Sequence, residues 1–354
     1  MMETLWSTMA KRAEPYIPGE QPNEENIIKL NTNENPYPPS PRVIDAITAE
    51  LGSNLRLYPS PTIDTLREKI ANYYEVAKDN VFVGNGSDEV LAFSFMAFFE
   101  PERRMKFPNV TYSFYPVYAK LFDIPYEEVP LRDDFTLPVE QFFDSDGGVI
   151  FPNPNAPTSL YLPLTEIEKI AANNKEKIVI VDEAYIDFAG ESAVSLTKQY
   201  DNVLVIQTMS KSRALAGLRV GFAIGNEALI AALIRMKDSF NSYPIDRLAM
   251  TGATAAMEDV AYFKETTKKI VATRTWVTDA LEKLGFSVLP SATNFLFATH
   301  ATVEAQHLYE TLKEQNILIR YFNTDPISEY VRITIGTDEE MREFLRAVEK
   351  IVSE

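Results

Sequence analysis

Short apolar runs alternate with segments of helical spacing along the first two thirds of the chain. Strands that are apolar on both faces and separated by helices are typical of a parallel or mostly parallel sheet with helices on both sides. A stretch of helical period such as Leu164 to Ala172 lies between two of these runs. This part of the chain therefore predicts an α/β fold. The expected strands are Val81–Val83, Val149–Phe151, Ile178–Val181, Val203–Ile206 and Val220–Ile224.

The pattern changes in the last third of the chain. Helical spacing persists for about 25 residues from Asp259 to Leu284. A long helix that leads into a compact α+β segment indicates a second, smaller domain, with the boundary between residues 240 and 258. Its expected strands and helices are Asn294–Ala298, Val303–Gln315, Val331–Ile335 and Glu339–Val352.

The N-terminal forty residues follow neither pattern. Seven prolines stand between residues 15 and 41, and proline is excluded from helix interiors and from central strands. We therefore expect an extended arm over residues 1–40, a large domain over 41–245 and a small C-terminal domain over 246–354.

Composition narrows the possible functions. The chain has 354 residues, with 34 Lys and Arg against 51 Asp and Glu, and a formal net charge of −17. So acidic a chain repels nucleic-acid phosphates and anionic lipid unless it carries a local basic cluster, and we find none. The most apolar run, Val90–Phe99, is about half the length of a bilayer span. We expect a cytoplasmic protein that binds neither nucleic acid nor membranes.

The chain has no cysteine and only two histidines, His300 and His307. Disulfides, cysteine nucleophiles and thiolate metal sites are therefore excluded. Neither histidine lies in the signature of a hydrolase triad or of a metal site. If this protein is an enzyme that moves protons, we expect lysine, tyrosine or a carboxylate to do so without a metal.

Two strand ends carry candidate catalytic groups. Asp182 follows the run Ile178–Val181, and Tyr185 stands three residues further on. Ligands gather at the carboxyl ends of strands in open α/β sheets, and an ionised carboxylate there needs a cation beside it. A helix cap or a turn would explain Asp182 equally well. The next strand, Val203–Ile206, leads to Lys211, which is available for Schiff-base chemistry.

Two loops have the composition of phosphate sites. Ser210 and Arg219 lie in a segment of small residues, and a hydroxyl with a forked guanidinium group suits a phosphate. A solvated basic loop is the alternative. Residues 84–88, Gly-Asn-Gly-Ser-Asp, lead from a strand into a helix, where free N–H groups attract anions. Ser87 or Asp88 could instead be an ordinary helix cap.

These features together indicate one ligand, an aromatic cation with a phosphate arm that condenses with lysine. Pyridoxal 5′-phosphate has these properties. Its protonated ring nitrogen would be the cation that Asp182 needs.

The motifs that carry this chemistry also resemble a known family. From about Tyr16 to the last helix, the chain is similar to the fold-type I pyridoxal-phosphate-dependent aminotransferases, and the spacing matches their histidinol-phosphate branch best. The resemblance implies a large domain with a mostly parallel mixed sheet flanked by helices, a smaller α+β domain, and an arm that packs on the small domain and on a dimer partner. The motifs are Asn31-Thr-Asn-Glu-Asn-Pro36, Gly86-Ser-Asp88, Asp182-Glu-Ala-Tyr185, Ser210-Lys211, Gly217-Leu-Arg219 and Val331-Arg-Ile-Thr-Ile-Gly336.

The resemblance implies a role for each matching residue. Lys211 would bind the cofactor covalently and shuttle a proton, Asp182 would pair with the ring nitrogen, and Tyr185 would bond the phenolic oxygen. Tyr112 would stack on the ring. Tyr58 would reach the phosphate of the neighbouring subunit, so that a homodimer completes the site. The residues that would hold the cofactor phosphate are Ser87, Asp88, Ser210 and Arg219.

One motif departs from the family pattern. Where the family has Asn-Pro-Asn-Asn-Pro-Thr-Gly, this chain has Asn-Pro-Asn-Ala-Pro-Thr-Ser over residues 153–159. Ala156 therefore stands where an asparagine would donate to the phenolic oxygen. That donor is missing, replaced by water, or supplied by Asn155 through a shifted turn, and Ser159 adds a mild constraint on the turn.

The resemblance also implies the substrate. Arg332 matches the arginine that binds the acidic end of substrates in this superfamily, and Arg320 matches a second cation of the histidinol-phosphate branch. Tyr16 and Asn33 match arm residues near the substrate. A phosphate dianion between two guanidinium groups is a sound pairing, although Arg320 could instead form a surface ion pair.

We therefore expect transamination of L-histidinol phosphate with 2-oxoglutarate, which gives imidazole-acetol phosphate and glutamate in histidine biosynthesis. An aromatic amino-acid aminotransferase and a threonine-phosphate decarboxylase share the cofactor residues and stay open as alternatives. A non-catalytic regulatory domain of the same fold is a further alternative, against which the intact Lys211, Asp182 and Arg219 argue.

Overall fold

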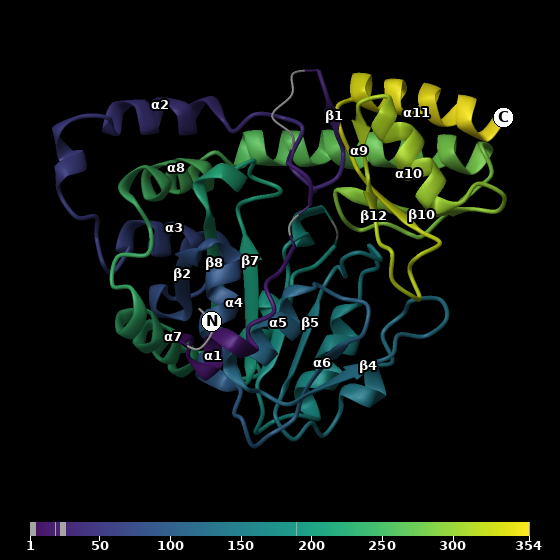
Figure 1. Cartoon of the computed structure of the whole chain (residues 1–354). Coiled ribbons are helices and arrows are strands. Elements are labelled where there is room, and N and C mark those ends of the chain that lie inside the picture. Colours follow the sequence, from purple (N-terminus) through teal and green to yellow (C-terminus); the bar gives the residue numbers. More distant parts are fainter. Residues whose placement is uncertain (1–4, 18, 22–25, 189, 354) are drawn as a thin grey trace.

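The computed structural model describes residues 5–17, 19–21, 26–188 and 190–353. Its largest sheet has seven strands in the order β2-β8-β7-β6-β5-β3-β4 (Figure 1). Neighbours from β7 to β4 run parallel, whereas β8 is antiparallel to both of its neighbours. The predicted α/β fold with a mostly parallel mixed sheet is confirmed. The strands are β2 (Val81–Asn85), β3 (Met105–Pro108), β4 (Tyr126–Val129), β5 (Val149–Pro152), β6 (Val179–Asp182), β7 (Val203–Thr208) and β8 (Val220–Gly225).

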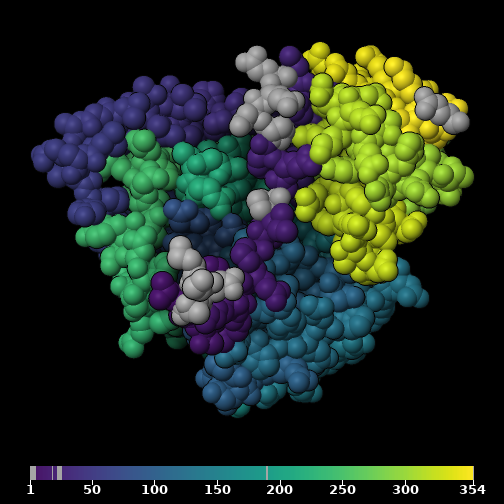
Figure 2. All heavy atoms as spheres, in the orientation of Figure 1, coloured from purple at the N-terminus to yellow at the C-terminus, as the bar shows by residue number. Residues whose placement is uncertain are grey.

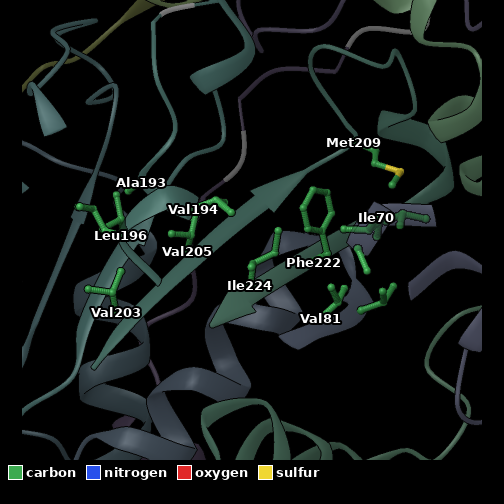
Figure 3. Packing of buried hydrophobic residues seen from close by; sticks show 14 of the residues in the cluster. Ile70, Val81, Ala193, Val194, Leu196, Val203, Val205, Met209, Phe222 and Ile224 are labelled. Atoms are coloured by element: carbon green, nitrogen blue, oxygen red, sulfur yellow. The ribbon is translucent and has the colours of Figure 1, made fainter. Parts of the chain in front are cut away.

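Alternate residues of each central strand enter two different cores. On β7, Val203 and Val205 pack into one core, while Leu204 and Ile206 pack into the other. Figure 3 shows the first of these cores, in which Phe222 and other side chains of β7 and β8 meet residues from other elements. Because both faces are covered, these strands are apolar at nearly every position, as the sequence pattern predicted.

Helices cover both faces of this sheet. Buried residues of α2, α3, α6 and α8 belong to the first core, and those of α4, α5 and α7 belong to the second. Helix α6 has the bounds that the sequence predicted. The helices are α2 (Pro41–Glu50), α3 (Asp64–Tyr74), α4 (Gly86–Phe98), α5 (Phe114–Phe122), α6 (Leu164–Ala172), α7 (Glu227–Phe240) and α8 (Arg247–Glu258).

The C-terminal part forms a separate core of its own around a four-stranded antiparallel sheet in the order β12-β13-β10-β9. The helices α9, α10 and α11 lie together with this sheet at the upper right of Figure 1. The predicted long helix, two strands and two helices all form, within a few residues of the expected bounds. The elements are α9 (Val260–Lys283), β9 (Phe286–Val288), β10 (Phe295–His300), α10 (Ala305–Glu314), β11 (Ile317–Leu318), β12 (Arg320–Tyr321), β13 (Val331–Thr334) and α11 (Asp338–Ser353).

The N-terminal arm is not extended throughout. A short helix, α1 (Thr8–Arg12), is capped by the Ser7 hydroxyl, and the expectation that the arm holds no helix is wrong here because the first proline comes only at residue 15. Further on, β1 (Ile28–Lys29) pairs in parallel with β11. Figure 2 shows the described part of the arm, in purple, crossing the surface between the large sheet's half of the molecule and the yellow C-terminal part.

The division of the chain at residues 40 and 245 stays a prediction. One observation bears on where such a boundary would fall. Helix α8 packs closely on α2 and α3, and its Ala249 and Ala253 belong to the core of the large sheet. Helix α9, which follows, contributes Ile270 and Val277 to the C-terminal core.

Candidate active site

The ends of five strands meet at one edge of the large sheet. Asp182, the last residue of β6, pairs with Pro152 on β5 and Ile206 on β7. The antiparallel β8 begins at the same edge, because its Val220 pairs with Asn85, the last residue of β2. Residues that follow or precede these ends are therefore brought together, as expected for the carboxyl edge of an α/β sheet.

A cavity of about 400 Å³ lies at this edge. Eight of the residues that the sequence proposed for cofactor binding line it together, although they come from five separate segments of the chain. They are Ser87, Asp88, Tyr112, Asp182, Tyr185, Ser210, Lys211 and Arg219. Ala156 lies in the wall of the same cavity, as do Thr32 and Glu34 from the arm.

Asp182 is 4% exposed and lines the cavity. The Tyr115 hydroxyl donates to Oδ2 over 2.8 Å. Oδ1 has no hydrogen-bond partner among the described residues. Burial raises the pKa of Asp182 to about 6, and the Tyr115 hydrogen bond opposes that rise. A buried carboxylate with one unpaired oxygen at a cavity is set to accept from a cationic donor.

Lys211 lines the same cavity, and its amine lies next to the arm. Its Nζ donates to the carbonyl oxygen of Thr32 over 2.9 Å. Burial, and then the positive charge of Arg332, lower the pKa of Lys211 to about 8. A lysine with so low a pKa is partly neutral near physiological pH, which Schiff-base chemistry requires. The Asn35 amide donates to the backbone carbonyls of Lys211 and Ser212, at 2.9 and 3.2 Å, and so fixes this turn to the arm.

The N-terminus of α4 packs closely against the start of β8. Arg219 Nη2 donates to Asp88 Oδ2 over 2.9 Å, and the Tyr112 hydroxyl donates to Asp88 Oδ1 over 2.8 Å. Close packing here excludes side chains at two glycines. A Cβ on Gly86, whose φ is +76°, would stand 2.5 Å from Arg219 Nη2, and one on Gly221 would stand 2.3 Å from the Ser87 backbone nitrogen.

Tyr185 links the cavity to the arm and to the small sheet. Asn33 Nδ2 donates to the Tyr185 hydroxyl over 2.9 Å, and the Thr334 hydroxyl donates to Asn33 Oδ1 over 3.0 Å. The Asn294 amide in turn donates to the Asn33 carbonyl over 3.0 Å. The predicted substrate residue Asn33 therefore lies directly behind a predicted cofactor residue.

The two predicted substrate arginines lie side by side on the small sheet. Arg320 on β12 pairs with Arg332 on β13. Burial lowers the pKa of Arg332, and so does the neighbouring Arg320 charge. Arg320 also lines a second cavity of about 530 Å³, together with Tyr16 of the arm. The Tyr16 ring lies tilted against Phe114, with 4.4 Å between the ring centroids.

Two predicted cofactor residues lie apart from the cavity. Asn155 is absent from its lining, and the Asn155 amide donates to the Val110 carbonyl and the Thr158 hydroxyl at 3.0 and 2.8 Å. Tyr58 is 80% exposed and stacks on Tyr243. Ser159 has a φ of +68°, the conformation for which glycine is favoured.

Three residues that belong to this arrangement were not found from the sequence. They are Tyr115 behind Asp182, Asn35 behind Lys211, and Glu183, whose carboxylate binds the Ser192 hydroxyl, the Ala193 N–H and the Gln207 amide at 2.5, 2.6 and 2.8 Å. Burial raises the pKa of Glu183 to about 7. Asn35 and Glu183 lie inside two of the motifs that resemble the family, and this position is the only feature of the sequence that points to them.

Comparison with known proteins decides the family. Residues 25–348 match the family described as aminotransferase class I and II. The chain belongs to this family. The prediction that it is an aminotransferase is confirmed.

Members and relatives of this family resemble the chain over its whole length. A histidinol-phosphate aminotransferase from Oceanobacillus iheyensis is 57% identical over 351 residues, which cover 99% of each chain. The crystal structure of the histidinol-phosphate aminotransferase from Clostridium acetobutylicum superposes with a TM-score of 0.85 at 26% identity, covering 92% of this chain and 99% of that one.

A third neighbour supports the fold. The histidinol-phosphate aminotransferase of Sinorhizobium meliloti, solved in complex with pyridoxal 5′-phosphate, has a TM-score of 0.84 at 24% identity and covers 92% of this chain and 91% of that one. The expected fold-type I aminotransferase architecture is confirmed. Within the described residues, no helix is both long enough and apolar enough to span a membrane.

Proposed function

We propose that this aminotransferase transfers the amino group of L-histidinol phosphate to 2-oxoglutarate with pyridoxal 5′-phosphate as cofactor. The products are imidazole-acetol phosphate and glutamate. Support for the substrate comes from the full-length 57% identity to a protein of that name. Support also comes from the paired Arg320 and Arg332, because a phosphate dianion suits two forked cations.

The residues of the cavity fit the cofactor chemically. The unpaired Oδ1 of Asp182 is the acceptor that a protonated ring nitrogen needs. Arg219, Ser87, Ser210 and the N-terminus of α4 would hold the phosphate, where a Cβ at Gly86 would intrude. Tyr112 would face the ring, and the Tyr185 hydroxyl would bond the phenolic oxygen.

The cofactor, once bound, would supply the carbonyl that takes up the amino group and a ring that withdraws electrons from the substrate's Cα. Lys211 anchors it, and the Lys211 amine then takes up the proton of the substrate's Cα. Its lowered pKa keeps the amine available as a base near neutral pH. Asp182 holds the ring nitrogen protonated. Arg332 and Arg320 orient the substrate by its anionic group.

Ala156 in the cavity wall provides no amide. The Asn155 amide is bonded to backbone and hydroxyl oxygens elsewhere. We therefore propose that Tyr185 is the protein's principal donor to the phenolic oxygen, with Asn33 orienting it.

A half-reaction screen tests this function. The holoenzyme is mixed separately with histidinol phosphate, phenylalanine, tyrosine and threonine phosphate, and loss of the lysine-bound cofactor absorbance is followed. Fastest reaction with histidinol phosphate supports the proposal. Equal or faster reaction with phenylalanine would leave an aromatic aminotransferase, and release of CO₂ from threonine phosphate would identify a decarboxylase.

We further propose a homodimer whose interface includes Tyr58. Tyr58 stacks on Tyr243, and several large apolar side chains in the chain segments next to these two residues are exposed. Exposed apolar side chains that gather on one surface mark an interface. Light scattering of the purified protein would give the mass, and Tyr58→Phe would weaken cofactor affinity if Tyr58 reaches the partner's site. The exposed apolar residues proposed for the interface are Leu51, Leu55, Leu57, Tyr58, Phe240 and Tyr243.

A cytoplasmic location stays a prediction.

A further inference from the structure

Tyr115 lies behind the cofactor cavity and does not line it. It is the second residue of α5 and has no exposed surface. Its hydroxyl donates to Asp182 Oδ2 over 2.8 Å. The Tyr115 ring is held by aromatic neighbours, with Phe107 at 6.0 Å and Tyr112 at 5.9 Å between ring centroids, both edge-to-face. Packing of the ring therefore fixes the hydroxyl in place next to Asp182.

This contact gives the two oxygens of the Asp182 carboxylate different surroundings. Oδ2 is occupied by Tyr115, and Oδ1 is without a partner among the described residues, on a side chain that lines the cavity. Without Tyr115, the carboxylate would lose its side-chain donor, keep only the weaker influence of the Ala184 backbone N–H, and could rotate. Buried charged groups are costly unless hydrogen-bonded. Tyr115 therefore supplies both an orientation and a compensating hydrogen bond.

We infer that Tyr115 is a positioning residue that presents Asp182 Oδ1 to the cofactor's ring nitrogen and keeps the carboxylate ionised. The inference rests on the proposed cofactor and concerns this chain's own residues around it. Tyr115 touches neither cofactor nor substrate, and it acts only through Asp182.

The electrostatic surroundings of Asp182 make this contact matter. Burial raises the Asp182 pKa, and the Tyr115 hydrogen bond is the largest effect that lowers it. The Asp88 charge raises the pKa, and the Ala184 backbone N–H lowers it by a smaller amount. The other titratable groups that line the same cavity are Glu34, Tyr112, Tyr185, Lys211 and Arg219. They are unchanged in a Tyr115 variant, so a difference between parent and variant isolates the effect at Asp182.

Tyr115→Phe removes the hydroxyl and keeps the ring. Tyr118→Phe is the matched control, because Tyr118 lies on the same helix and its hydroxyl donates to the Asp88 backbone carbonyl over 2.9 Å instead. The apoproteins are titrated by fluorescence with pyridoxal 5′-phosphate and with an analogue in which C–H replaces the ring nitrogen. Thermal unfolding of each apoprotein accompanies the titrations.

Tyr115→Phe should lose affinity for pyridoxal phosphate on the order of tenfold, the effect of one hydrogen bond to a charged group. Affinity for the analogue should be unchanged, because the analogue has no ring nitrogen for Asp182 to hold. The acid midpoint of pyridoxal phosphate binding should move up by about one pH unit, since losing the donor favours protonated Asp182. Tyr118→Phe should leave the ratio of the two affinities at the parent value.

Equal losses for both ligands in Tyr115→Phe would reduce Tyr115 to a structural residue and overturn the inference. So would an unchanged affinity for pyridoxal phosphate. A parent protein that bound neither ligand would be a different result, because it would overturn the proposed function and the inference with it.

Discussion

Arg320 and Arg332 occupy directly opposed positions on the antiparallel strands β12 and β13. Both guanidinium groups also lie near the Phe322 ring, at 5.4 and 5.5 Å from its centroid. Like charges opposed across a ladder destabilise a sheet. Burial lowers the Arg332 pKa as well, and Arg332 Nε has no partner among the described residues. A multiply charged anion would relieve this arrangement.

Replacing each arginine in turn should affect the half-reactions of the two substrates differently. Arg320→Ala should damage the histidinol-phosphate half-reaction much more than the 2-oxoglutarate half-reaction, while Arg332→Ala should damage both. Losing a charge-assisted hydrogen bond in a desolvated pocket costs on the order of 2–5 kcal/mol, roughly 30- to several-thousand-fold in kcat/KM. Single-turnover kinetics with each substrate measure this. The exposed Arg346 on α11 provides a control substitution.

A nearly silent Arg320→Ala, together with equal rates for phenylalanine and histidinol phosphate in the parent enzyme, would contradict the substrate assignment. An aromatic ring has no use for a second guanidinium group. The aminotransferase activity itself would be untouched by that result.

Lys211→Ala should retain cofactor binding and lose catalysis. The proposed phosphate site of Ser87, Ser210 and Arg219 remains, so pyridoxal phosphate should bind non-covalently, without the absorbance band of the lysine-bound form. Multiple turnover should fall below detection, whereas substitution of the exposed Lys175 should have no effect. Turnover near the parent rate would remove Lys211 from its role.

The sequence predicted the residues at the edge of the sheet that line the cavity better than the residues that support them from behind. Asp182, Lys211 and Arg219 could be placed because fully apolar strands fix which residues follow their carboxyl ends. Tyr115 could not be placed in this way, since it lies on a helix in a run of aromatic residues that reads only as core. Its hydrogen bond to Asp182 depends on how α5 packs against β6.

The same limit applies to the arm. Its prolines correctly exclude a long helix, yet they carry no information on the β1–β11 pairing or on the Lys211–Thr32 contact. Both contacts join residues far apart in the chain. Every residue has a backbone carbonyl, so the residue type at position 32 does not show that its carbonyl accepts a hydrogen bond. The resemblance to a family placed Asn33, but the bond to Tyr185 required coordinates.

Covalent capture of the cofactor should depend on pH through Lys211. Only the neutral amine reacts, and the Lys211 pKa is lowered to about 8. The rate of capture by apoprotein should therefore rise with pH, with a midpoint near that pKa, and level off roughly one pH unit above it. Arg332→Met should move the midpoint to higher pH, because the Arg332 charge is the second cause of the lowering, after burial. Stopped-flow absorbance from pH 6 to about pH 10 measures both midpoints. An identical midpoint in Arg332→Met would exclude this coupling.

Asp182→Asn should cost far more in kcat than in stability. A neutral amide cannot hold the ring nitrogen protonated, so the electron-withdrawing capacity of the ring is lost.

The same substitution should not lower the stability of the apoprotein, because the buried Asp182 charge is itself unfavourable there. The folded-state pKa of Asp182 is raised to about 6 from 3.8, so folding favours the protonated carboxyl, and the associated stability is full below about pH 4 and lost as the pH rises through 6. The amide does not ionise, and the apo variant at pH 7.5 should be at least as resistant to urea as the parent. A variant that unfolds at markedly lower urea while its holoenzyme retains the parent kcat would make Asp182 a structural residue. Measuring both quantities on the same preparation distinguishes the two roles, because the unpaired Oδ1 predicts a loss of function without a loss of fold.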